Sequence, residues 1–130
     1  MRFRLFLAVV SVAIGAEHPD LNGVWKTADA GETISIHQKD DAVEIAEQGK
    51  ETSDIQCNTM GQACKVKGGE VTMWFNNGTL VVMESLHGNS KVIKKRLKVA
   101  DDGKSLEEEI VHIVPAGSTE KVSLVRESRS

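Results

Sequence analysis

The sequence predicts an all-β domain, an antiparallel up-and-down meander of about 8–10 strands that forms a barrel or a strongly curved sheet. Three observations support this prediction. Apolar and polar residues alternate with period two along most of the chain, and short turns rich in Gly, Asn and Asp separate the alternating runs. No segment keeps an apolar period of 3.6 residues, so a helical fold is not expected.

The first 16 residues are typical of a secretory signal peptide. Arg2 and Arg4 give a basic start, residues 5–14 are apolar, and the small residues Gly15 and Ala16 follow at a cleavage site. The apolar stretch is shorter than the about 20 residues of a spanning helix. The alternatives are a retained membrane anchor and a buried first strand. We expect one domain over residues 17–130, secreted or periplasmic, with no membrane association after cleavage.

The charge of this domain argues against nucleic acid as a partner. Without residues 1–16 the chain holds 14 basic and 19 acidic residues, a net charge of −5. A mildly acidic protein has little attraction for phosphate backbones or anionic membranes.

Cys57 and Cys64 are the two cysteines of the chain, and an oxidising compartment allows them to pair in a short loop. Free thiols are the alternative. Two thiolates with no nearby His do not make a metal site, so we expect no metal.

A Gly-x-Trp segment, residues 21–26, begins the strands after a polar lead-in at residues 17–20. Trp25 is expected to close one end of the barrel, and Gly23 allows the chain to pass close to it. A turn at residues 28–31 precedes an alternating strand over residues 33–37. A further strand follows Asp40-Asp41 and ends near Gly49, whereas residues 51–60 are less regular.

Stronger turn signals organise the second half of the domain. Asn77-Gly78, a strong hairpin signal, separates strands at residues 71–75 and 79–86. Gly88-Asn89 precedes a long strand at residues 91–100. Residues 101–104 precede a strand at 106–114, and a three-residue loop at 115–117 leads to the last strand, 118–126.

Each turn fixes a register, and the registers together define an interior face. Lys98 faces Glu107 and Arg96 faces Glu109, and such opposite-charge pairs are typical of a solvated surface. The other face is therefore the interior. Its apolar residues are Val71, Met73, Phe75, Leu80, Val82, Ile93, Leu97, Val99, Leu106, Ile110, Val114, Val122 and Leu124.

Four polar residues fall on the same interior face: Glu84, Lys95, Glu108 and His112. The registers place Lys95 near the other three, pair Glu108 with Leu124 and put Arg126 diagonal to Glu108. One interpretation is a polar group that orients a ligand inside the barrel. The other is an open rim or a satisfied buried network. The predicted ligand-binding residues are Met73, Phe75, Val82, Glu84, Lys95, Glu108 and His112.

Large apolar residues also fall on the outer face, among them Trp74, Val81 and Met83. Such residues can mark a contact with a protein partner. The alternative is that the side-chain stems of Lys94 and Arg96 cover them.

The Gly-x-Trp segment and a basic residue on the last strand resemble the signature of the calycins, the lipocalins and their relatives. The resemblance implies a lipocalin-like barrel in which Trp25, with Gly23 before it, closes the floor and Arg126 packs across the indole. In size the chain is similar to small exported lipocalin-like domains of bacteria. It departs from the family by its shorter length and by lacking a Thr-Asp-Tyr-type motif, so a large ligand cavity is not implied.

No catalytic signature is present, because the Ser, His and Gly residues lack nucleophile-elbow, metal-ligand and phosphate-loop contexts. We therefore expect a non-enzymatic protein without a cofactor. The leading hypothesis is binding of a small, largely apolar molecule. The alternative is a protein-interaction or inhibitor module that acts through the Trp74 face, the N-terminal residues 17–20 or the Cys57–Cys64 loop.

Overall fold

The computed structural model describes residues 19–49 and 52–128. Within these ranges the chain forms one antiparallel sheet of ten strands and no helix, so none that could cross a membrane. The strands are β1 (Gly23–Lys26), β2 (Thr33–Lys39), β3 (Ala42–Gln48), β4 (Ser53–Asn58), β5 (Cys64–Val66), β6 (Gly69–Asn76), β7 (Thr79–Leu86), β8 (Lys91–Val99), β9 (Ser105–Val114) and β10 (Glu120–Ser128). The predicted signal peptide lies outside the described residues and stays a prediction.

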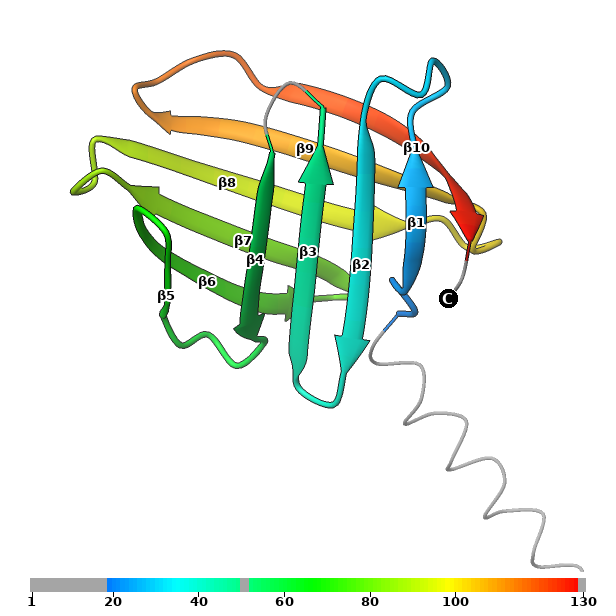
Figure 1. Ribbon diagram of the computed structural model, residues 1–130, viewed down its shortest axis with the longest axis horizontal. Coiled ribbons are helices and arrows are strands. Elements are labelled where there is room, and N and C mark those ends of the chain that lie inside the picture. Colours follow the sequence, from blue (N-terminus) through cyan, green and yellow to red (C-terminus); the bar gives the residue numbers. More distant parts are fainter. Residues whose placement is uncertain (1–18, 50–51, 129–130) are drawn as a thin grey trace, which may run out of the picture.

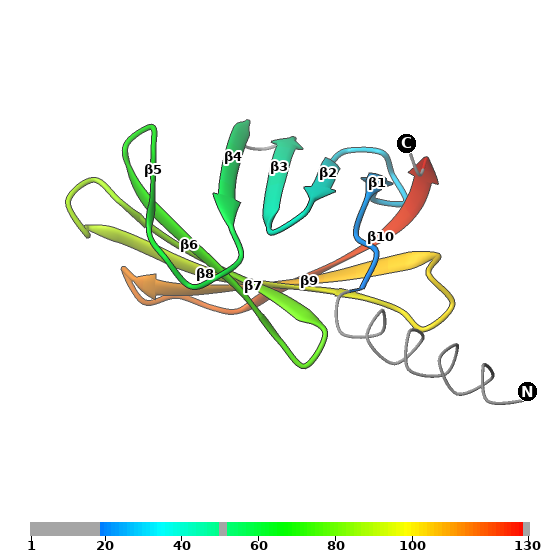
Figure 2. The same ribbon diagram turned by 90° about the horizontal axis from the view of Figure 1, so that it is seen from below.

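The sheet curls into a nearly closed barrel, as the sequence predicts. Its strand order is β4-β3-β2-β1-β10-β9-β8-β7-β6-β5, so the first and last strands of the chain pair with each other. Figure 1 shows β1–β4 crossing over β6–β9, and Figure 2 shows the same two halves facing each other. The interior lies between these two halves.

The seam of the barrel runs between β4 and the β5–β6 hairpin. There the predicted disulfide is confirmed, because Cys57 in β4 is bonded to Cys64 in β5. An isolated bridge also pairs Met60, in the loop between the two cysteines, with Trp74 in β6. The disulfide loop therefore joins the two edges of the sheet.

Three predicted registers are confirmed by the pairs Met73–Val82, Glu84–Ile93 and Leu97–Glu108. The turn chemistry explains the first of these pairs. Asn77 and Gly78 adopt φ values of 52° and 83°, the left-handed conformation that a two-residue hairpin requires at both positions. The surface pairing of Arg96 with Glu109 is also confirmed, at 2.7 Å between Arg96 Nη1 and Glu109 Oε1.

The predicted register of the last hairpin is wrong by two residues. Glu108 pairs with Val122 and not with Leu124, because the connection between β9 and β10 spans residues 115–119 rather than 115–117. An even shift keeps the same side chains on the interior face. It moves Arg126 away from Glu108, and Arg126 instead pairs with Trp25.

The hydrophobic core fills the interior beside β1, β2 and β3 and continues across β6–β10. Its members come from both halves of the barrel: Leu21, Trp25, Ile34, Ile36, Val43, Ile45, Cys57, Val71, Met73, Leu80, Val82, Leu97, Leu106 and Leu124. Burial of these side chains supplies the main driving force for folding. This core packs between the two halves, and a cavity remains beside it.

Candidate ligand-binding cavity

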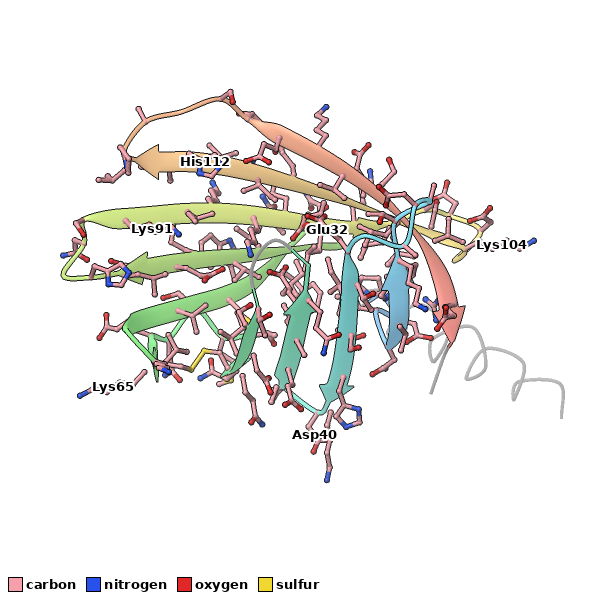
Figure 3. All side chains as sticks on the ribbon, turned by 45° about the horizontal axis from the view of Figure 1, so that its top comes forward. Glu32, Asp40, Lys65, Lys91, Lys104 and His112 are labelled. Atoms are coloured by element: carbon pink, nitrogen blue, oxygen red, sulfur yellow. A yellow bond between two sulfur atoms is a disulfide. The ribbon has the colours of Figure 1, made fainter. Side chains whose placement is uncertain are left out.

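A cavity of about 650 Å³, at what we call the open end of the barrel, is lined by residues of the β1–β2 loop and of strands on both halves, from β2–β4 and from β7–β9. Figure 3 labels three of its lining residues, Glu32, Lys91 and His112, which come from the β1–β2 loop, β8 and β9. Asp40, in the β2–β3 turn, lies away from them in the same view. The apolar lining residues are Ile34, Ile55, Val66, Leu86, Ile93 and Ile110.

Lys95 is the centre of a charged cluster in the cavity wall. Its Nζ lies 2.9 Å from Oε1 of Glu47 and 3.3 Å from Oε2 of Glu84, and the three side chains are largely buried. Burial acts to lower the pKa of Lys95, but Glu47 and Glu84 outweigh it, so the pKa is raised and the ammonium stays charged.

Glu108 is the most deeply buried acid of this cluster, with only 3% of its surface exposed. Burial, reinforced by the charge of Glu47, raises the pKa of Glu108 to about 8, although Lys95 acts in the opposite direction. The raised pKa favours the protonated form of Glu108 at neutral pH, and its buried Oε2 is left without a hydrogen-bond partner among the described residues.

His112 also lines the cavity but belongs to a separate pair. Its Nε2 lies 2.6 Å from Oε2 of Glu120, at the start of β10. Both side chains are more exposed than those of the Lys95 cluster, which places this pair nearer the rim.

The predicted ligand-binding residues thus divide into two groups. Glu84, Lys95, Glu108 and His112 line the cavity. Met73 and Val82 are fully buried in the core, and Phe75 packs against it, so none of these three lines the cavity wall. A role in ligand binding stays a prediction for all seven.

Glu47 is the member of the cluster that the sequence analysis missed. It continues the inward alternation of Val43 and Ile45 in β3, so its direction was readable from the sequence. Its ion-pair partner Lys95 could not be predicted, because β3 and β8 do not pair and their side chains meet only across the interior of the barrel.

Trp25 does not line the cavity and is packed in the core where β1 pairs with β10, a region that we call the closed end of the barrel; that Trp25 plugs the barrel stays a prediction. The indole is fully buried and its Nε1 donates to the carbonyl of Leu21 at 3.0 Å. The guanidinium carbon of Arg126 lies 4.4 Å from the centroid of the ring, and its Nη atoms donate to the carbonyls of Asn22 and Asp20. Gly23 has a φ of 134°, a conformation that favours glycine.

A metal centre has no support within residues 19–49 and 52–128. In those ranges no three His, Cys, Asp or Glu side chains are arranged to hold a metal ion.

Comparison with known proteins bears on the fold. No protein-family model matches the chain, and no curated protein matches it in sequence. Among solved structures, the barrel matches a secretary abundant heat soluble (SAHS) protein from Ramazzottius varieornatus with a TM-score of 0.64. The two proteins share a fold. The match covers 83% of this chain and 96% of that chain at 15% identity, so the likeness concerns the fold alone. Membership of the calycins and a bacterial source stay predictions.

Proposed function

We propose that this chain is an exported, non-enzymatic, lipocalin-like protein that binds a small, largely apolar molecule in the cavity. The observation that carries the proposal is the cavity itself. Its volume of about 650 Å³ lies within the range of about 300–1,000 Å³ that is usual for small-molecule sites. Apolar side chains joined by a few convergent polar groups are the usual lining of such sites.

The proposed export rests on the signal-like residues 1–16 and is supported by the disulfide. Cys57 and Cys64 are bonded, and a disulfide persists in oxidising compartments. Expression of the full chain with N-terminal sequencing of the product tests this part. Processing near Ala16 is expected, and an intact Met1 in the exported fraction would contradict it.

Titration with Nile red, a neutral lipophilic dye, tests binding directly. The wild-type protein is expected to enhance the dye fluorescence with saturable, one-to-one binding. Ile110→Trp places a larger side chain in the cavity wall and should weaken binding by about tenfold, since it occupies the space of the ligand. Val111→Trp, at the neighbouring outward position, is the matched control and should bind as the wild type does. Equal binding by both variants would place the dye outside the cavity.

A second candidate function, protein binding, is favoured by one observation. Met60 is 61% exposed and pairs with Trp74, so the disulfide loop and the Trp74 face form one surface. The alternative that the outer residues are covered also has support, since Val81 beside Trp74 is only 2% exposed. Capture of partners by the wild type and by a Met60→Ala/Trp74→Ala variant tests this candidate. Unchanged capture would exclude this surface.

A further inference from the structure

We propose that the molecule bound in this cavity carries a cationic amine, which the carboxyl groups of Glu47, Glu84 and Glu108 receive beside Lys95. The inference rests on the proposed function, because it names the head group of the ligand that the cavity would bind. It concerns recognition only and involves no reaction.

The charges around Lys95 are not balanced. Three carboxyl groups converge on one ammonium, and two of them, those of Glu47 and Glu84, already lie within 3.3 Å of it. The Lys95 ammonium is therefore occupied. A carboxylate ligand would have to displace one of these acids and then lie beside the others, where like charges repel. An added cation would instead be attracted by the excess of carboxyl groups.

Glu108 also has an oxygen without a hydrogen-bond partner among the described residues. Glu108 lines the cavity with only 3% of the residue exposed, and this oxygen, Oε2, is itself buried. A buried acceptor without a donor costs free energy, which a ligand that donates can recover. An ammonium group has three donors and no acceptor, whereas a carboxylate has acceptors only. An amine that contacts Glu108 would supply the donor that this oxygen lacks.

The rest of the cavity lining is also more acidic than basic. Beyond the cluster, the cavity is lined by three more acids, Glu32, Asp54 and Glu120, and by two more lysines, Lys67 and Lys91. Acidic groups therefore outnumber basic ones around the whole chamber. A concave surface with one sign of charge in excess raises the local concentration of ligands of the opposite sign.

Amine binding also has a proton signature. A cation beside Glu108 favours the carboxylate, so binding should release the proton that Glu108 holds at neutral pH. Affinity for an amine should accordingly rise between about pH 6 and 9, since less free energy is then spent on ionising Glu108. The titratable groups around Glu108 in the cavity are Glu32, Glu47, Glu84, Lys95, His112 and Glu120.

Displacement of Nile red by three matched ten-carbon probes tests the inference at pH 8. The probes are decylamine, decanol and decanoate, which differ in the charge of the head group. Decylamine is expected to displace the dye at a concentration about tenfold lower than decanol, and decanoate should be the weakest. Equal displacement by all three, or a preference for decanoate, would overturn the amine inference and leave the proposed function standing. No dye binding and no displacement would overturn both.

A pair of variants tests whether Glu108 causes the preference for the amine. Glu108→Gln should weaken decylamine binding about tenfold while decanol binding is retained, which shows that the cavity is still folded. Calorimetry in buffers of different ionisation enthalpy should show proton release on amine binding to the wild type and none in Glu108→Gln. Glu107→Gln, at the exposed outward position next to it, is the control and should behave as the wild type does. Unchanged amine preference and proton release in Glu108→Gln would exclude Glu108 from the site.

Discussion

Both ends of this barrel bury charged side chains, but only at the open end do these side chains line the cavity. At the closed end, one cation, Arg126, covers the ring of Trp25, and its Nη atoms donate to carbonyls of the lead-in. At the open end, the carboxyl groups of Glu47, Glu84 and Glu108 outnumber their one cation and surround a cavity.

The two ends differ in whether a cavity lies beside the buried charge. Within residues 19–49 and 52–128, each end has one buried side-chain polar atom without a hydrogen-bond partner, Arg126 Nε and Glu108 Oε2. At the closed end this atom belongs to the guanidinium that packs on the Trp25 ring, and neither residue lines the cavity. At the open end Glu108 is one of the residues that line a cavity, together with Glu47, Glu84 and Lys95. The contrast teaches that a buried charge indicates binding only where packing leaves volume beside it.

The largest expected effect is on the closed end. Trp25→Ala should lower the free energy of unfolding by about 3–5 kcal/mol, because it removes the largest buried side chain and leaves a void under Arg126. Urea unfolding measures this loss. Trp74→Ala, on the half-buried outer face, is the control and should cost clearly less. Equal losses would show that Trp25 has no special place in the core.

The next effect concerns the seam. Loss of the Cys57–Cys64 bond should cost about 2–3 kcal/mol, since the short loop gains freedom in the unfolded chain. A Cys57→Ala/Cys64→Ala variant and thermal unfolding with and without reductant measure it. Reductant should lower the melting temperature of the wild type and leave that of the variant unchanged. A wild type insensitive to reductant would contradict the predicted role.

The stability that the open end contributes should depend on pH. Glu108 has a folded-state pKa raised to about 8, so the stability it contributes is complete below its unfolded pKa of about 4.5 and is lost as the pH rises through 8. Relative to Glu108→Gln, which does not titrate, the wild type should lose about 1–3 kcal/mol between pH 5 and 9. Denaturant unfolding at both pH values measures the difference. A constant difference would mean that Glu108 titrates alike in the folded and unfolded chains.

The smallest effect belongs to the surface between the two ends. The Arg96–Glu109 pair is partly exposed, and a double-mutant cycle to alanine should give a coupling of about 0.2–1 kcal/mol that decreases with salt. A coupling as large as that of a buried pair would show that this face is covered, as a partner surface would be.

Local turn signals in the sequence were sufficient to predict the strand pairing in most of the sheet. Asn77-Gly78 sets the pairing of Met73 with Val82 because a two-residue turn leaves one register. The last hairpin lacked such a signal, since Ser118 and Thr119 suit a strand as well as a loop. The fold class and the interior face were therefore predictable, and the register of β10 was not.

The candidate site was only half predictable, for a different reason. Glu84, Lys95 and Glu108 lie on successive strands, so hairpin registers bring them together. Glu47 contacts Lys95 from the opposite wall of the barrel. The curvature that brings these two walls together cannot be predicted from a local sequence pattern. The volume of the cavity depends on the same curvature. The sequence therefore could not decide whether these polar residues form a satisfied buried network or line a binding site.

The central claim, that the open end binds a ligand and the closed end does not, is tested most directly by amide NMR during titration with decylamine and, separately, decanol. The account predicts saturable shifts at Glu47, Glu84, Lys95 and Glu108, with the indole N–H signal of Trp25 unmoved. Shifts centred on Trp25 and Arg126, or spread around Trp74 on the outer face, would contradict it.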